Sequence, residues 1–259
     1  MRSYSRNYGY QFDIGSYFPP AIKAICIACI AMFFVQEVSR LLFGAAGWNF
    51  WIVVFGLRPY AVTHFFFVWQ LFTYLFLHGG IWHILLNLLY LCMFGADIER
   101  MWGAKRFATY FFVCGAGAGL INVIVKTAID PHGIGSSLNP TIGASGAIYG
   151  ILLAAAMVMP YSKVWVFPLP VSISMRVFVI IMGALEFFMT LGATGDNVSH
   201  VCHLGGMLVG YLYLRRGSFL YNFRNTFSDW QRRRLRRKFD VYVRDHEEKP
   251  PRNPDNWVN

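Results

Sequence analysis

The sequence predicts an all-α polytopic membrane protein built as a bundle of six transmembrane helices. Of its 259 residues, 56% are hydrophobic and 14% are charged, whereas soluble domains carry about 25% charged residues. The apolar residues come in long blocks that charged or turn residues separate. A soluble chain of this size could not bury so much apolar surface without exposing large patches. The lipid bilayer is therefore the expected solvent.

Six apolar blocks are predicted to cross the bilayer, because about 20 apolar helical residues span its hydrocarbon core. In chain order they cover residues 21–43, 81–98, 106–127, 143–159, 173–192 and 198–214. The connection 44–80 is rich in Trp, Phe and Tyr and nearly free of charge, which favours the membrane interface over a seventh span. We expect an N-terminal cytoplasmic segment (1–20), a membrane domain (21–214) and a basic cytoplasmic tail (215–259).

Lysine and arginine residues set the expected orientation. Arg100, Lys105 and Arg106 follow the second span, and the tail after the sixth span is strongly basic. The positive-inside rule then places both termini in the cytoplasm. The short N-terminal segment lacks the pattern of a cleavable signal, which favours the inner (cell) membrane of a bacterium over an organelle.

From Arg215 onward, beside the last span, the chain carries +6 of its net charge of +10. Such a tail is expected to contact anionic lipids; nucleic-acid binding is the weaker alternative, because no known binding module accompanies the charge. Apolar residues recur there at helical spacing, which indicates an amphipathic helix on the inner membrane surface or docked on the protein's own loops: Leu220, Phe223, Phe227 and Trp230. The five cysteines lie in apolar segments, so disulfide or metal chemistry is not predicted.

Four polar residues inside the spans share one depth. With a rise of about 1.5 Å per residue, His83 and Asn87 lie roughly 24 and 18 Å above the cytoplasmic end of their helix. Ser145 and His203 lie roughly 22 and 18 Å above theirs. Intramembrane polar groups are costly and therefore indicate function. A hydroxyl beside an imidazole base, with amide, imidazole and helix-start backbone N–H groups as donors to an oxyanion, suits acyl transfer.

Three motifs carry a resemblance to a known family. Gly143-Ala144-Ser145-Gly146 resembles the GxSG motif of rhomboid intramembrane proteases. The segment from His203 to Gly210 is similar to that family's catalytic-histidine helix. The segment from His78 to Asn87, with HxxxN at its end, resembles the family's second helix. The resemblance covers residues 70–214 and has all three motifs in family order, whereas GxSG alone would be a weak indication.

The resemblance implies a role for each matching residue. Ser145 would be the nucleophile and His203 its base, while His83 and Asn87 would complete the oxyanion hole. The ring of Tyr149 would pack against His203. The family uses a dyad without an acid, which agrees with the absence of Asp or Glu one turn from His203. No metal or cofactor is implied.

Glycines in the motifs predict close packing of the fourth and sixth spans. They lie in the serine motif and on one face of each of these two spans: Gly143, Gly146, Gly150, Gly206 and Gly210. Such faces let helix backbones approach closely, which would bring Ser145 and His203 within hydrogen-bonding distance. Ordinary packing of membrane helices accounts for the same glycines equally well.

Two further intramembrane residues allow alternative interpretations. His200 lies three residues before His203 and is a rival base, but the HxxGxxxG spacing favours His203 and gives His200 a structural role. Glu186 lies in the fifth span, which the resemblance places at the lateral route by which substrate arrives. Our hypothesis is that Glu186 faces the water-filled cavity and influences gating or substrate choice. The alternative is a carboxyl hydrogen-bonded to a neighbouring helix.

The predicted function is hydrolysis, by a Ser-His dyad, of peptide bonds in or near transmembrane segments of membrane proteins. The substrate must unwind there, because carbonyls in a helix are internally bonded. One rival is a rhomboid-like protein that binds transmembrane clients without cleaving them. Another is a small transporter using the same polar layer, which the lack of an inverted repeat disfavours. The sequence predicts neither a particular substrate nor an oligomeric state.

Overall fold

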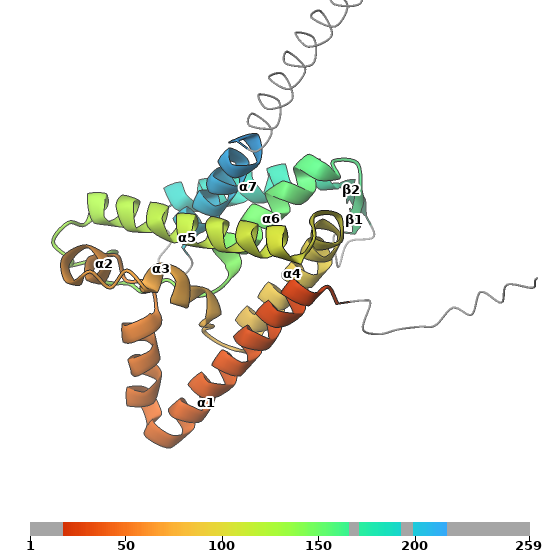
Figure 1. Cartoon of the computed structure of the whole chain (residues 1–259). Helices are drawn as coiled ribbons and strands as arrows, with labels where there is room; N and C mark the ends of the chain where they lie inside the picture. Colours follow the sequence, from red (N-terminus) through yellow and green to blue (C-terminus); the bar gives the residue numbers. More distant parts are fainter. Residues whose placement is uncertain (1–17, 166–170, 193–198, 217–259) are drawn as a thin grey trace, which may run out of the picture. The chain divides into compact units, whose positions relative to one another are not determined.

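Helices account for most of the described chain, which comprises residues 18–165, 171–192 and 199–216 of a computed structural model (Figure 1). Each of the six regions expected to hold a span contains a helix within this part. The segment before residue 18 and the basic tail beyond residue 216, with its expected amphipathic helix, lie outside the described residues.

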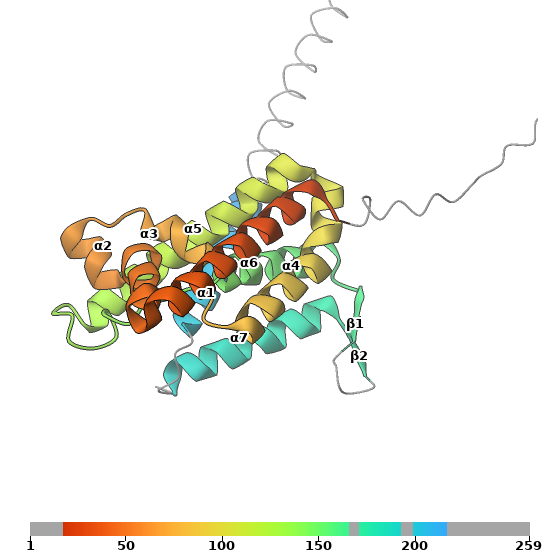
Figure 2. The same ribbon diagram turned by 90° about the horizontal axis from the view of Figure 1, so that it is seen from below.

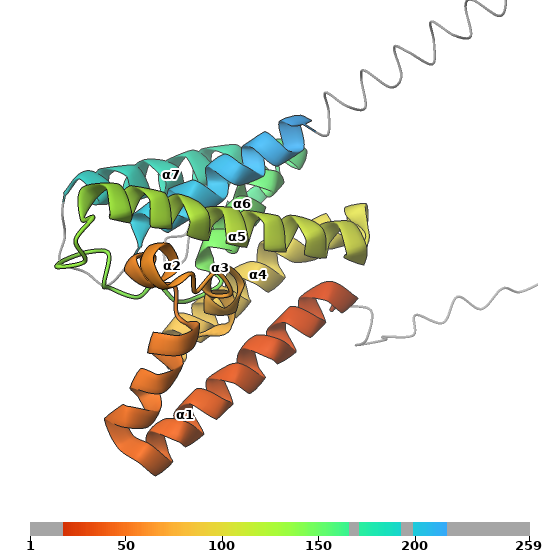
Figure 3. The ribbon, with the colours of Figure 1, turned by 60° about the vertical axis from the view of Figure 1, so that its left-hand side comes forward.

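The first helix, α1 (Pro20–Phe55), is longer than the predicted span and consists of two arms that meet at Gly44. Proline suits the first position, because its missing N–H would have no partner there anyway. Gly44 has φ 60° and ψ −138°, a conformation that glycine adopts far more readily than other residues. Figures 1 and 3 show the two arms diverging from this bend. The first arm matches the predicted span, and the second extends into the connection.

The connection contains more helix than the sequence predicts: α2 (Pro59–Phe65), α3 (Gln70–Thr73) and the short 3-10 helix η2 (Tyr74–Phe76). Side chains on and beside α3 bind the last carbonyls of α1, which have no partner within that helix. Trp69 donates to the carbonyl of Val54 (2.9 Å), Gln70 to that of Val53 (3.0 Å), and Thr73 to that of Phe55 (2.7 Å). The connection is thereby fastened to the end of α1.

The remaining helices gather around α6 (Ser145–Val158), of whose 14 residues ten are buried. Before α6 come α4 (Ile81–Trp102) and α5 (Ala104–Ile129), and after it come α7 (Met175–Leu191) and the helix at 200–216. α6 packs against α4, α5 and α7 (Figure 2). A residue on α6 therefore has side chains from several helices within reach.

A small hairpin stands between α6 and α7. β1 (Lys163–Trp165) pairs antiparallel with β2 (Ser172–Ser174), so that Val164 lies opposite Ile173. Val164 is buried, whereas the residues on either side of it are exposed. The region predicted as the fifth span thus begins as a strand, and its helix starts at Met175.

The chain is a multi-pass membrane protein. α1, α4 and α5 are long and apolar enough to cross a bilayer. α6 has 14 residues and α7 has 17, so neither reaches that length within the described residues. Large apolar side chains on these helices are exposed, as lipid-facing residues are: Ile27, Phe34, Leu41, Leu89, Ile124 and Phe188. The number of six crossings stays a prediction.

Candidate active site

Ser145 and His203 lie side by side although 58 positions separate them in the chain. Ser145 is the first residue of α6, and His203 lies in the first turn of the helix at 200–216. Oγ of Ser145 is 2.7 Å from Nε2 of His203, which is a hydrogen-bonding distance. Tyr149 stacks on the imidazole, with ring centroids 4.4 Å apart and planes inclined by 11°. The hydroxyl and the imidazole form a partly buried pair between two helices.

Glycines on the two helices make this approach sterically feasible. A methyl group added at Gly206 would overlap the carbonyl oxygen of Gly146, and one added at Gly210 would lie 3.3 Å from Cα of Gly150. Larger residues at these positions would push the two backbones apart. The contact between serine and histidine therefore depends on small residues within about two turns of Ser145 and of His203.

The backbone that leads into Ser145 is fixed by the connection. Leu57 and Thr141 exchange two backbone hydrogen bonds of 2.9 and 2.8 Å, and the N–H of Gly143 donates to the carbonyl of Tyr74 (2.9 Å). α6 therefore begins from an anchored segment rather than from a free loop.

The loop between α5 and this segment is folded around Asp130. Its carboxylate accepts hydrogen bonds from the N–H groups of Ile134 (3.1 Å), Gly135 (2.8 Å) and Ser137 (3.0 Å), and from the Ser137 hydroxyl (2.7 Å). These bonds, the hydroxyl of Ser137 foremost, hold the pKa of Asp130 well below its ordinary value, because they stabilise the charged form.

His83 and Asn87 of α4 lie beside the turn from which Ser145 emerges. Gly143 has φ 113°, and a Cβ atom there would lie 2.6 Å from Nε2 of His83 and 3.8 Å from Nδ2 of Asn87. The N–H of Gly79 donates to Nδ1 of His83 (3.2 Å), so Nε2 carries the ring proton and is a donor. Nδ2 of Asn87 gives one of its two hydrogens to the carbonyl of His83 (2.8 Å). Each side chain thus has an N–H left near the start of α6.

His78, in the turn before α4, supports this end of the site. Its ring stands 5.2 Å from that of His83, its backbone N–H donates to Gln36 (3.2 Å), and its Nδ1 lies 3.2 Å from the carbonyl of Phe76. Burial, with the nearby His83 ring as a smaller cause, lowers the pKa of His78 to about 4. The imidazole is therefore neutral at pH 7.

Glu186 reaches the pair from α7, and the sequence did not indicate this contact. Oε1 accepts a hydrogen bond from the hydroxyl of Tyr149, and Oε2 accepts one from Nδ1 of His200 (2.6 Å). The same Oε2 lies 3.0 Å from Nδ1 of His203. The side chain of Glu186 is buried and bonded to neighbouring helices, which is the arrangement that the alternative describes. An influence of Glu186 on gating or substrate choice stays a prediction.

Glu186, His200 and His203 form a group that could hold a metal ion. One ligand atom each of Glu186, His200 and His203 lies within 4.8 Å of the others. Two ligands bound to one zinc ion, each about 2.0–2.2 Å from it at tetrahedral angles, stand about 3.4 Å apart. Oε2 of Glu186 and Nδ1 of His200 are only 2.6 Å apart, which fits a shared proton rather than a shared metal.

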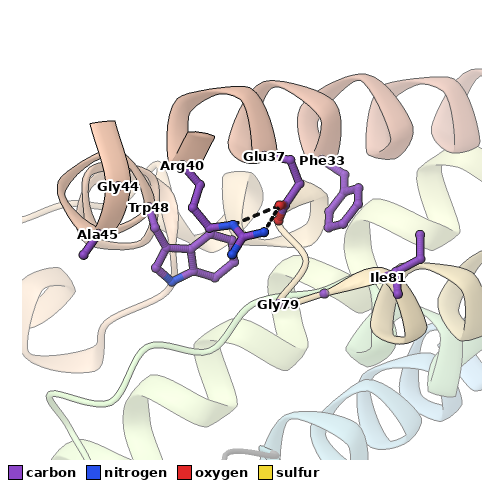
Figure 4. Close-up of a pocket in the computed structure, with 9 residues that line it drawn as sticks. Phe33, Glu37, Arg40, Gly44, Ala45, Trp48, Gly79 and Ile81 are labelled. Atoms are coloured by element: carbon purple, nitrogen blue, oxygen red, sulfur yellow. Dashed lines mark hydrogen bonds and ion pairs between the residues drawn. The ribbon is translucent and has the colours of Figure 1, made fainter. Parts of the chain in front are cut away.

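A cavity of about 950 Å³ adjoins the other end of the site (Figure 4). It lies between the α1 bend and the turn before α4: Phe33, Glu37, Arg40, Gly44, Ala45, Trp48, Gly79, Gly80 and Ile81. Figure 4 shows the ion pair of Arg40 and Glu37 on its wall, at 2.6 Å. Because Gly79 also binds His83, the cavity and the His83 ring share one turn of backbone.

The residues of this site lie in a region that matches a known protein family. The family model described as "Rhomboid domain" matches residues 66–217 of this chain. This range is more than half of the chain and includes every site residue from His83 to His203. The chain belongs to the rhomboid family.

Relatives of this rhomboid chain include proteins of a plant, a bacterium and a parasite. RHOMBOID-like protein 1 of Arabidopsis thaliana is 31% identical over 173 residues, which cover 64% of this chain and 40% of the relative. Rhomboid protease GluP of Bacillus subtilis is 30% identical over 182 residues, or 70% of this chain and 32% of the relative. Rhomboid-like protease 3 of Toxoplasma gondii is 29% identical over 146 residues, or 55% and 49%. The rhomboid chain thus spans less than half the length of these relatives.

Within this rhomboid chain, the residue that sequence reasoning placed differently is Glu186. Spacing in the sequence indicates an acid partner only within one helical turn of His203, whereas Glu186 approaches from a separate helix. The available indication was the place of Glu186 inside the predicted fifth span, because carboxyls within membrane spans are rare. That place alone does not tell which way a side chain points around its helix axis.

Proposed function

We propose that this rhomboid chain is an intramembrane serine endopeptidase that hydrolyses peptide bonds in or near transmembrane segments of membrane proteins. The observation that carries the proposal is the 2.7 Å contact between Oγ of Ser145 and Nε2 of His203. Two relatives are named as proteases, GluP and rhomboid-like protease 3, which favours hydrolysis over client binding without cleavage.

In the acylation step, Oγ of Ser145 attacks the carbonyl carbon of the scissile bond while its proton passes to Nε2 of His203. The carbon–nitrogen bond then breaks, and the imidazolium gives that proton to the leaving amine. In deacylation, His203 takes a proton from a water molecule that attacks the acyl group. The same proton returns to Oγ of Ser145 when the acid product leaves, so the enzyme is regenerated.

The negative charge that forms on the carbonyl oxygen needs donors aimed at it. Three N–H groups meet at the start of α6: Nε2 of His83, Nδ2 of Asn87 and the backbone N–H of Ser145. The last has no acceptor within the first turn of its helix. We assign these groups to the oxyanion hole, with the turn at Gly143 setting their spacing.

The substrates would be transmembrane proteins whose helix unwinds locally, because only then is a carbonyl accessible to Ser145. The lipid-exposed α7 would border the route by which they arrive, as the family resemblance implies. We place both termini in the cytoplasm, on the distribution of Lys and Arg, and we propose the inner (cell) membrane of a bacterium as the location of the chain. The membrane domain would cover 21–214, and the basic tail at 215–259 would bind anionic lipids.

The proposal is tested by cleavage of a labelled single-span substrate in proteoliposomes. Ser145→Ala and His203→Ala should each lower the rate by about 10³-fold or more. Ser162→Ala and His132→Ala, whose parent side chains are exposed, are the matched controls and should retain the rate. Cleavage that survives in Ser145→Ala contradicts the mechanism. A wild-type protein inactive on several helix-broken substrates favours client binding instead.

A further inference from the structure

Resting on the proposed function, we propose that Glu186 is a third member of the catalytic group, a positioning residue whose carboxylate orients His203 and stabilises it while it holds the proton. The family resemblance implies a dyad of Ser145 and His203 alone. The assignment therefore adds an acid to this chain that the motif pattern does not contain.

The three side chains form a continuous series of contacts across three helices. Oγ of Ser145 lies 2.7 Å from Nε2 of His203, and Nδ1 of the same ring lies 3.0 Å from Oε2 of Glu186. The nucleophile and the carboxylate thus contact opposite nitrogens of one imidazole. In general-base catalysis by histidine, an acid at one nitrogen keeps the other available to the nucleophile.

The carboxylate determines which nitrogen of His203 carries the proton. An ionised carboxylate only accepts hydrogen bonds, so Nδ1 beside it is the protonated nitrogen and Nε2 keeps the lone pair that faces Ser145. Among the described residues, Nδ1 of His203 is buried without a well-aligned hydrogen-bond partner. Oε2 of Glu186, at 3.0 Å but off the N–H direction, is the acceptor beside it. Catalytic hydrogen bonds of this kind commonly tighten when substrate binds.

Two other side chains fix the carboxylate in this place. The hydroxyl of Tyr149 donates to Oε1 of Glu186, and Nδ1 of His200 donates to Oε2 at 2.6 Å. Because Tyr149 also stacks on His203, one tyrosine holds both the carboxylate and the imidazole. Glu186 is 7% exposed and His203 is 9% exposed, and a charge so buried acts more strongly on its neighbour than it would in water.

The alternative is a purely structural Glu186 that only joins α7 to α6 and to the helix at 200–216. That role predicts a less stable protein whose folded molecules cleave at the normal rate. The positioning role predicts slower chemistry in a protein that still binds substrate. Turnover, substrate affinity and stability therefore have to be measured separately.

The experiment compares wild type with Glu186→Gln and Glu186→Asp in the full chain, reconstituted in proteoliposomes. Glu99→Gln is the matched control, because Glu99 is a buried carboxylate outside the site that accepts the N–H groups of Ala21 and Ile22, each at 2.8 Å. The readouts are kcat per folded molecule and KM for a labelled single-span substrate, with the midpoint of thermal unfolding.

We expect Glu186→Gln to lower kcat by about 10²-fold or more, with KM changed less than about twofold. Glu186→Asp should recover part of the lost kcat, since it keeps the charge. Glu99→Gln should lower the unfolding midpoint and leave kcat unchanged. This pattern separates the action on His203 from the packing of helices.

A kcat for Glu186→Gln equal to that of wild type overturns the inference, as does a kcat for Glu186→Asp no higher than that for Glu186→Gln. Loss of wild-type activity on treatment with a chelator would assign Glu186, His200 and His203 to a metal ion instead. Ser145→Ala distinguishes a failure of the proposed function from a failure of the role of Glu186. Cleavage by Ser145→Ala would sink the proposed function itself, whereas an inactive Ser145→Ala beside a fully active Glu186→Gln would sink only the role of Glu186.

Discussion

Two carboxylates are buried in the described helices, and their surroundings differ. Glu99, near the end of α4, is 2% exposed, and its two oxygens accept the N–H groups of Ala21 and Ile22 at the start of α1. Glu186, on α7, is 7% exposed, and its oxygens contact the side chains of a tyrosine and two histidines.

The partners decide what each carboxylate can do. Backbone N–H groups neither gain nor lose protons, and at a helix start they lack other partners and carry a partial positive charge. Glu99 therefore fastens α1 to α4 and has no further chemistry available. The partners of Glu186 include imidazoles that take up and release protons, one of which contacts a serine hydroxyl. Burial of a charge alone does not indicate catalysis; the proton-transfer capacity of its partners does.

The largest difference in effect on catalysis is expected between the two ends of α4. His83 lies at its start, within the site, and Glu99 lies near its end, outside the site. His83→Ala should lower kcat by about 10²–10³-fold, the usual cost of losing one oxyanion donor. The midpoint of thermal unfolding should change little. Cleavage kinetics in proteoliposomes measure the first quantity and a thermal melt the second. An unchanged kcat would remove His83 from the oxyanion hole.

His78 shows what burial does to an imidazole that lacks a carboxylate partner among its described contacts, since its Nδ1 lies beside the Phe76 carbonyl. Its pKa is lowered to about 4 by burial, from an ordinary value of about 6.5. The unfolded chain therefore binds a proton first as the pH falls. Above about pH 6.5 the neutral imidazole of His78 makes its full contribution to the free energy of unfolding. As the pH falls from there to about 4, about 3 kcal/mol of that free energy is lost.

Unfolding of wild type and His78→Gln at several pH values between 7 and 4 checks this linkage. His78→Gln should lose less stability on acidification than wild type, because the substituted side chain does not titrate. Equal losses of stability in the two proteins would mean that protonation of His78 does not cause the loss of stability in acid.

The smallest expected effect is that of Glu99→Gln on stability. Replacing the charged acceptor at the start of α1 should cost about 1–2 kcal/mol of unfolding free energy. Cleavage by the folded protein should remain at the wild-type rate. A fall in kcat for Glu99→Gln would mean that Glu99 and Glu186 do not differ in their effect on catalysis.

The sequence predicted most of the architecture, because long apolar blocks and glycine motifs are local signals. It indicated helices in all six regions, and it singled out Ser145 and His203, which the structure brings into contact. The second arm of α1 and the short helices of the connection were not predicted. They depend on Trp69, Gln70 and Thr73 binding carbonyls at least 15 positions earlier, and no local pattern encodes such pairs.

The position of Glu186 could not be predicted for a related reason. Its depth follows from counting residues along α7, but its direction depends on how α7 is rotated against α6 and the helix at 200–216. That rotation results from packing between helices that are far apart in the chain. The contact with Tyr149 on α6 is the kind of information that spacing in one helix does not contain.

Covalent labelling of Ser145 in the membrane-embedded protein tests the pairing of Ser145 with His203 most directly. A fluorophosphonate reacts with a serine whose proton a neighbouring base removes, and peptide mass mapping identifies the modified residue. We predict a single modified serine, Ser145, with labelling lost in His203→Ala and slowed in Glu186→Gln. Modification of another serine, or labelling of Ser145 that does not depend on His203, would contradict the proposed mechanism.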